Sequence, residues 1–168
     1  MPAKETIERA NQDAREGKAP STQAGEFVRE EMDHIHEGKH GARSTKQAIA
    51  IGLSKARRAG VKLPPPDAGK TSPDTARHAA RDYRKGQASP NSKPAPNRSR
   101  ATSKALKREG SEAASHNALS RQAHRAARTR GSANLKSAAL KTVRTKGAEG
   151  RTQAAVKAAR TRQRSKQR

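Results

Sequence analysis

Apolar residues recur along residues 44–60 with the spacing of one helix face. Ser44 is a typical N-cap, and Gln47, three residues later, completes a capping box. Glycine suits the left-handed backbone position that follows a helix, and Gly60 stands at the end of the pattern. The pattern therefore predicts a helix whose start and end are both encoded. Its apolar stripe consists of Ile49, Leu53, Ala56 and Gly60.

Two weaker amphipathic patterns precede this helix. Residues 2–17 place Ile7 among alanines on one stripe, and residues 21–37 place Val28 and Ile35 on another. The second and third helices are separated by about six residues, which favours an antiparallel hairpin. We therefore expect an all-α head over residues 1–63, built as a hairpin or as three helices.

The remainder of the chain is divided by proline-rich stretches. Three prolines begin at Pro64 and cannot continue a helix, because proline lacks a backbone N–H. Ser72 and Pro73 together form a typical helix start. The predicted order after the head is a linker at 64–72, a basic helix at 73–86, a linker at 87–100 and a basic tail at 101–168.

The basic tail repeats with a period of 16 residues, in units 117–132, 133–148 and 149–164. Each unit reads as an alanine-rich basic helix, with breaks expected near Gly131 and Gly147. The units contain too few large apolar residues to stack as a solenoid. We interpret them as short helices that form on a polyanion and are largely disordered without one. Random drift within an alanine-, lysine- and arginine-rich sequence is the alternative.

Composition limits how much of the chain can fold. Leucine, isoleucine, valine and phenylalanine together number 15 of 168 residues, and most of the 30% hydrophobic content is alanine. Such a chain is expected to be largely disordered, because burial cannot offset the entropy of ordering. Most of the large apolar residues lie in residues 1–63, so the folded part is expected there. A core this small favours completion by a homodimer.

Charge points to a polyanionic partner. The net charge is +23, and its sign changes along the chain: residues 1–37 carry −4, residues 38–63 carry +7 and residues 64–168 carry +20. A basic tail behind a mixed-charge head is typical of nucleic-acid binding. Membrane binding is disfavoured because the apolar faces consist of alanine rather than large side chains. A merely solvated tail is the simpler alternative.

No constellation of residues indicates enzyme chemistry, a cofactor or a small-molecule substrate. His34, His36 and His40 lie close in sequence, but Gly38 interrupts the helix that would align His36 with His40 as metal ligands. No distant histidine or cysteine completes the set, so we expect no metal site. Phe27 and Tyr83 are the only aromatic side chains. Base stacking, on which reading of single-stranded RNA depends, is therefore not expected.

The run Lys-Gln-Ala-Ile-Ala-Ile-Gly-Leu-Ser-Lys-Ala-Arg-Arg-Ala-Gly at residues 46–60 resembles a motif of a bacterial domain-of-unknown-function family. The resemblance extends over about residues 30–62, with Glu37 to Gly41 as its lead-in. It implies a bacterial origin rather than an activity. The basic tail is similar in composition to bacterial histone H1-like proteins.

The sequence therefore predicts a bacterial, cytoplasmic, nucleoid-associated protein that binds DNA through phosphates without sequence specificity. The alternatives are an RNA- or ribosome-associated factor, and a protein-interaction module with a solvated tail. The expected nucleic-acid contacts are Lys46, Lys55, Arg57, Arg58, Lys62, Arg128, Arg130, Arg144, Lys146, Arg160 and Arg162.

Overall fold

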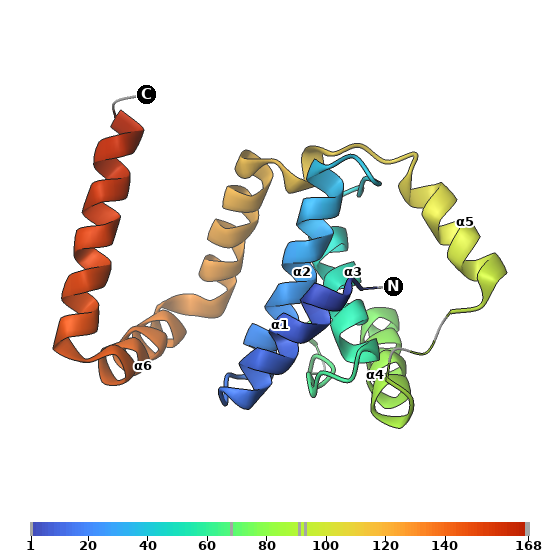
Figure 1. Cartoon of the computed structure of the whole chain (residues 1–168), viewed down its shortest axis with the longest axis horizontal. Helices are drawn as coiled ribbons and strands as arrows, with labels where there is room; N and C mark the ends of the chain where they lie inside the picture. Colours follow the sequence, from blue (N-terminus) through green and yellow to red (C-terminus); the bar gives the residue numbers. More distant parts are fainter. Residues whose placement is uncertain (1, 68, 91, 93, 167–168) are drawn as a thin grey trace. The chain divides into compact units, whose positions relative to one another are not determined.

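The computed structural model describes residues 2–67, 69–90, 92 and 94–166, apart from the side chains of 142, 145, 146, 165 and 166. All regular structure in this part of the chain is helical, which confirms the predicted all-α class (Figure 1). The chain divides into two compact units, Met1–Gln122 and Ala123–Arg168. The helices are α1 (Lys4–Arg15), α2 (Pro20–His36), α3 (Thr45–Arg58), α4 (Pro73–Ala88), α5 (Pro96–Leu106), the 3₁₀ turn η1 (Glu112–Ala114) and α6 (His116–Lys166).

Helix α3 has the ends that the sequence encodes. The Ser44 hydroxyl accepts a hydrogen bond from the backbone N–H of Gln47 at 3.2 Å. The Gln47 side chain reaches back to the N–H of Arg43 at 2.8 Å, one residue earlier than in a standard capping box. Gly60 follows the helix with a φ of +96°, a backbone conformation that favours glycine.

Helices α2 and α3 form the centre of the first unit and run antiparallel. Ile35 packs in one cluster with Ala48, near the end of α2 and the start of α3. Phe27 packs in a second cluster with Ala56, at the opposite ends of the two helices. The helices approach closely at Gly52, where an added Cβ would lie 2.7 Å from the Cα of Val28.

Helix α1 covers one side of this hairpin and contributes Ala10 to the second cluster (Figure 1). Most core positions are alanine, so close packing rather than large apolar side chains holds the helices together. Phe27 and Ile35 are the largest apolar side chains that are fully buried. The buried apolar residues are Ala10, Ala24, Phe27, Met32, Ile35, Ala42, Ala48, Ala56, Val61, Ala79, Ala113 and Ala114.

Helix α4 packs against α3 through a second close approach. Gly86 lies inside α4, not at its end as the sequence suggested, and an added Cβ would meet the carbonyl oxygen of Arg57 at 1.8 Å. The Ser54 hydroxyl donates to the Asp82 carboxylate at 2.6 Å and joins the two helices. The glycine therefore serves helix packing, and α4 continues to Ala88.

The segment after α5 returns to the head, although the sequence placed it in the basic tail. The N–H of Gly41 donates to the carbonyl of Leu106 at 3.0 Å, and the N–H of Ala42 donates to that of Gly110 at 3.1 Å. The Thr45 hydroxyl donates to the carbonyl of Ala113 at 2.6 Å. Ala113 and Ala114 are buried in the first cluster. These alanines gave no hydrophobic signal, because alanine contributes little area to any periodic pattern.

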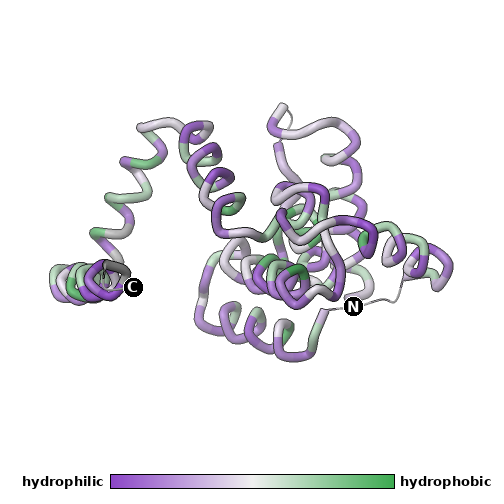
Figure 2. Tube along the Cα trace, turned by 90° about the horizontal axis from the view of Figure 1, so that it is seen from above, coloured by the Kyte–Doolittle hydropathy of each residue, from purple (hydrophilic) through white to green (hydrophobic). Residues whose placement is uncertain are grey.

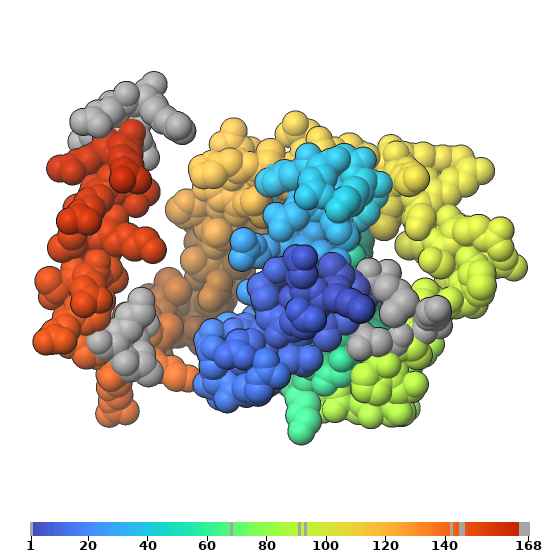
Figure 3. All heavy atoms as spheres, in the orientation of Figure 1, coloured from blue at the N-terminus to red at the C-terminus, as the bar shows by residue number. Residues whose placement is uncertain are grey.

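Helix α6 begins in the first unit, and its residues from Ala123 onward form the second unit. The backbone leaves helical dihedral angles at Gly131 (φ 74°, ψ 162°) and Gly147 (φ 63°, ψ −175°), near the predicted breaks. Helix α6 has no single apolar face. Hydrophilic and hydrophobic residues are mixed along its trace (Figure 2). Its C-terminal stretch is a rod one helix wide (Figure 3). The large apolar residues Leu135, Leu140, Val143 and Val156 are exposed.

The described part of α6 is helical through Lys166, so the predicted disorder of the basic tail is not shown. None of the described helices combines the length and the hydropathy that crossing a membrane requires.

Candidate nucleic-acid interface

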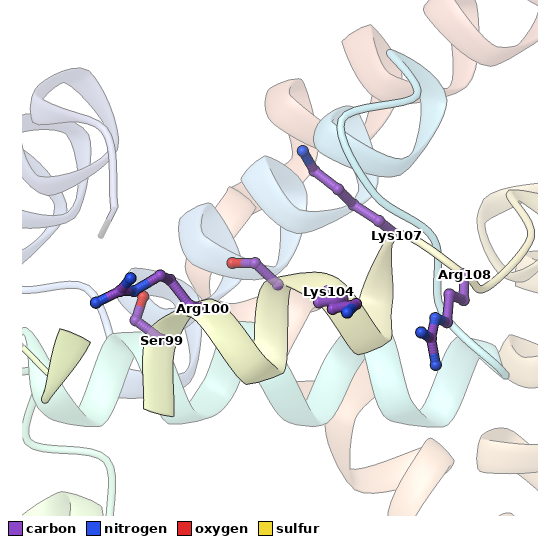
Figure 4. Close-up of a pocket in the computed structure, with 6 residues that line it drawn as sticks. Ser99, Arg100, Lys104, Lys107 and Arg108 are labelled. Atoms are coloured by element: carbon purple, nitrogen blue, oxygen red, sulfur yellow. The ribbon is translucent and has the colours of Figure 1, made fainter. Parts of the chain in front are cut away.

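Helix α5 carries a basic face that the sequence analysis did not select. Its positive side chains are spaced as one helix face, and they line a shallow hollow of about 450 Å³ together with two serines. Figure 4 shows these side chains extending from α5 and from the residues that follow it. The lining residues are Ser99, Arg100, Ser103, Lys104, Lys107 and Arg108.

No acidic residue lies between Pro96 and Arg108, so no carboxylate within this stretch neutralises the hollow. Helix α5 has no buried residue, and the four cations are exposed. Arginine and lysine with neighbouring serine hydroxyls are the groups that bind phosphate oxygens in protein–nucleic-acid complexes. The recurrence of positive charge at positions 100, 104, 107 and 108 was a visible signal, but the sequence analysis placed Arg100 in a linker and the other three positions in the basic tail.

Helix α6 presents five of the eleven predicted contacts to solvent. Residues 116–166 contain 14 lysines and arginines and a single acid, Glu149. The first predicted pair lies before the break at Gly131, and the last pair lies after the break at Gly147. The exposed members of the predicted set in α6 are Arg128, Arg130, Arg144, Arg160 and Arg162. Lys146 lies outside the side chains that the structure describes.

The predicted contacts of the head divide into two groups. Lys46 and Lys62 are exposed, and Arg58 is half-buried at the wall of a cavity between α3 and α5. These three side chains can reach a ligand from solvent. Lys55 and Arg57 are instead engaged in the fold.

Arg57 has a structural role in place of the expected phosphate contact. Its side chain is buried, and it donates to the carbonyl oxygens of Leu63 and Pro64, both at 3.2 Å. Burial lowers the pKa of the Arg57 guanidinium, against the opposing effect of Asp82. The residue therefore fastens the start of the proline-rich linker to α3. A periodic pattern cannot distinguish such an inward arginine from an exposed one.

Lys55 forms an ion pair inside the cavity. Its ammonium lies 2.5 Å from the Oε2 atom of Glu31, a residue with no solvent exposure. The cavity has a volume of about 580 Å³ and is lined by α2, α3 and α5, including His34, His40 and Arg98. Burial and the Lys55 ammonium lower the pKa of His34, which favours the neutral form of its ring.

Among the described residues, one group has the side chains and spacing of a metal site. One ligand atom each of Glu31, His34 and His40 lies within 4.8 Å of the others. His36 is not part of it, because its Nε2 atom lies 2.6 Å from the carbonyl oxygen of Ala114. Sequence reasoning considered the histidines and missed Glu31, since a carboxylate in an amphipathic helix is normally exposed.

A comparison with protein families finds a match over the head. Residues 2–66 match a family of unknown function, DUF6496. The DUF6496 match covers α1, α2, α3 and the three prolines after them, which confirms the expected resemblance to a domain of unknown function. Helices α4, α5 and α6 lie outside it. No curated protein and no solved structure matches the chain.

Proposed function

We propose that this protein binds nucleic acid through its phosphates and without sequence specificity, with duplex DNA as the preferred form. The observation that carries the proposal is the charge of residues 116–166, with 14 lysines and arginines against one acid. Phosphate contacts from such side chains supply affinity and release counterions, but they carry no sequence information.

The distribution of charge on α6 favours binding without one fixed docking face. Helical spacing places Arg121, Arg125 and Arg128 on one side of the first stretch and Arg130 on the opposite side. The two breaks let each stretch follow the nucleic acid in its own direction. We infer that α5 adds a further phosphate contact through the basic hollow, and that α6 orders on DNA and frays without it.

The head has a different role in this proposal. Its exposed cations Lys46 and Lys62 support binding, and its apolar clusters support folding. We propose that two heads pair as a homodimer. We propose a nucleoid-associated, histone H1-like protein of the bacterial cytoplasm. An RNA- or ribosome-associated factor uses the same electrostatics, and a protein-interaction module leaves the cations solvated.

Competition binding separates these three functions. The full chain is bound to a fluorescent duplex and displaced with unlabelled duplexes of unrelated sequence, with single-stranded RNA and with double-stranded RNA. The proposal predicts equal displacement by all DNA duplexes, to within a few-fold, and weaker displacement by either RNA. Preferential displacement by RNA supports the ribosome-associated alternative. An absence of duplex binding at low salt refutes the proposal and leaves the protein-interaction module.

A further inference from the structure

Two consecutive carboxylates are buried beneath the cavity of the first unit. Glu30 is 4% exposed and Glu31 is fully buried. The Oε1 atom of Glu30 accepts a hydrogen bond from the backbone N–H of Ala3 at 2.9 Å, and Lys55 occupies Oε2 of Glu31. The remaining oxygens, Oε2 of Glu30 and Oε1 of Glu31, have no hydrogen-bond donor among the described residues. Leaving a buried carboxylate oxygen unpaired is costly, so this site is suited to a further cation.

His40 presents a second acceptor to the unpaired oxygen of Glu31. The Nδ1 atom of His40 lies 3.1 Å from the carbonyl oxygen of Gly41 and is placed to donate to it. A neutral ring with its proton on Nδ1 has a lone pair on Nε2. That atom lies 3.4 Å from Oε1 of Glu31. Two acceptors facing one another at this distance are stabilised by a positive ion that binds both.

The separation of these two atoms fits a tetrahedral metal. Bonds of about 2.0–2.1 Å from zinc to nitrogen and oxygen place neighbouring ligand atoms about 3.3 Å apart. A hydrogen bond from the second ring nitrogen to a backbone carbonyl is also the usual device that orients a ligating histidine. His40 therefore has the position of a metal ligand, and a proton on its Nδ1 atom is the tautomer that ligation through Nε2 requires.

His34 supplies the third ligand from the preceding turn. It follows Glu31 by three residues on α2, so both side chains lie on the same face. Its ring meets that of His40 edge to face, with centroids 5.9 Å apart and an angle of 81° between planes. One ligand atom from each of the three residues lies within 4.8 Å of the others.

We propose that Glu31, His34 and His40 bind one divalent transition-metal ion, with Zn²⁺ as the first candidate. Two imidazoles and one carboxylate suit zinc and its neighbours, whereas magnesium and calcium prefer oxygen ligands alone. Three protein ligands leave the fourth position to water or to an exogenous anion from the cavity. This proposal does not depend on nucleic-acid binding.

Lys55 sets the orientation of the carboxylate in this arrangement. Its ammonium holds Oε2 of Glu31 and leaves Oε1 directed towards His40. Lys55 therefore pairs with one oxygen of Glu31 and leaves the other to a metal ion.

Zinc titration of the chelator-treated full chain by calorimetry tests the proposal. We expect one high-affinity ion per chain, and Co²⁺ in its place should give the intense visible absorption bands of a tetrahedral complex. His34→Gln removes a ligand and leaves the Lys55–Glu31 pair intact. We expect it to weaken zinc binding by about a hundredfold or more.

His78→Gln is the matched control, because His78 is exposed on α4 and lies outside the site. It should bind zinc with unchanged affinity and stoichiometry. Circular dichroism of each variant establishes that its helices are retained, and the Co²⁺ spectrum of the unaltered chain provides evidence that needs no variant. The absence of a tetrahedral Co²⁺ spectrum, or an equal loss of affinity in both variants, overturns the assignment.

Discussion

Phe27 and Leu140 are both large apolar residues on helices, yet Phe27 is 1% exposed and Leu140 is 58% exposed. Phe27 lies on α2 of the head and packs in one cluster with Ala10 of α1 and Ala56 of α3. Leu140 belongs to Ala123–Arg168, which we call the C-terminal unit, where one helix is broken at two glycines and its large apolar residues stay exposed. The comparison teaches that the first region depends on tertiary contacts, whereas the helix of the second region exposes its large apolar residues and lacks that support.

The head and the C-terminal unit also differ in how far acidic residues balance their lysines and arginines. Some cations of the head form ion pairs with its own carboxylates, as in Arg9–Glu26 at 2.7 Å and Lys55–Glu31 at 2.5 Å. The C-terminal unit contains Glu149 as its single acid. A polyanion is the partner that this excess of positive charge favours.

Truncation of the two apolar side chains gives the largest expected contrast. Phe27→Ala leaves a cavity in the second cluster and should lower the free energy of unfolding of the head by about 4 kcal/mol. Leu140→Ala should change it by less than about 0.5 kcal/mol, because the residue is exposed. Urea denaturation of the full chain, followed by circular dichroism, measures both values. Comparable losses in the two variants would show that the C-terminal unit has a core of its own.

Removal of one lysine from each region tests the use of charge. Lys55→Ala leaves the fully buried Glu31 without its cation and should destabilise the head by about 3 kcal/mol, near the lower limit for buried pairs because Lys55 is 23% exposed. Lys157→Ala should leave the midpoint of denaturation unchanged, since Lys157 is exposed on α6. An unchanged midpoint for Lys55→Ala would contradict the buried pair.

Glycine substitutions test the close approach of α2 and α3. Gly52→Ala inserts a methyl group 2.7 Å from the Cα of Val28 and should cost about 2 kcal/mol of stability. Gly25→Ala, on α2 with open space around its Cα, should stabilise by about 0.5–1 kcal/mol through helix propensity. The midpoints of thermal denaturation of the two variants should therefore shift in opposite directions. A rise for Gly52→Ala would mean that the helices lie farther apart.

The smallest effect on stability is expected at the first break of α6. Gly131 has a φ of +74° and no neighbour within 4 Å of an added Cβ. Gly131→Ala should therefore remove the break and increase the helical circular dichroism signal, while the denaturation midpoint of the head stays constant. A fall in that midpoint would show that the break holds α6 against another part of the chain.

The sequence predicted most of the helices of the head, but it did not predict the later segment, around Ala113 and Ala114, that packs against them. Capping residues and apolar stripes are local signals, so α2 and α3 were found together with the Ser44 cap. The return of Ala113 and Ala114 to the core depends on backbone hydrogen bonds from Ala42 and on the Thr45 hydroxyl, across about 70 residues of sequence. No local pattern encodes such contacts, and alanine gives no apolar contrast.

The candidate sites likewise include features that the sequence predicted and features that it did not. The charge of α6 is a compositional property and was found directly, together with breaks near Gly131 and Gly147. The inward direction of Lys55 and Arg57 was not predictable, because helical spacing gives a residue's face but not the partner packed against it. Glu31 was missed for that reason, since its burial arises only when His40 and Lys55 converge on it from two other segments.

The salt dependence of duplex DNA binding tests the central claim most directly. Fluorescence anisotropy is measured for the full chain and for the triple variant Arg128→Gln, Arg144→Gln and Arg160→Gln. A second triple variant, Lys4→Gln, Arg15→Gln and Lys39→Gln, removes the same charge from exposed positions of the acid-rich head.

The account predicts that logarithmic affinity falls linearly with logarithmic salt concentration, with a slope of about −0.9 for each phosphate contacted. The first variant should bind less tightly at low salt and show a slope smaller in magnitude by about 2.7. The head variant should keep nearly the full slope. Equal slopes for all three proteins, or binding that is independent of salt, would contradict the assignment of nucleic-acid binding to α6.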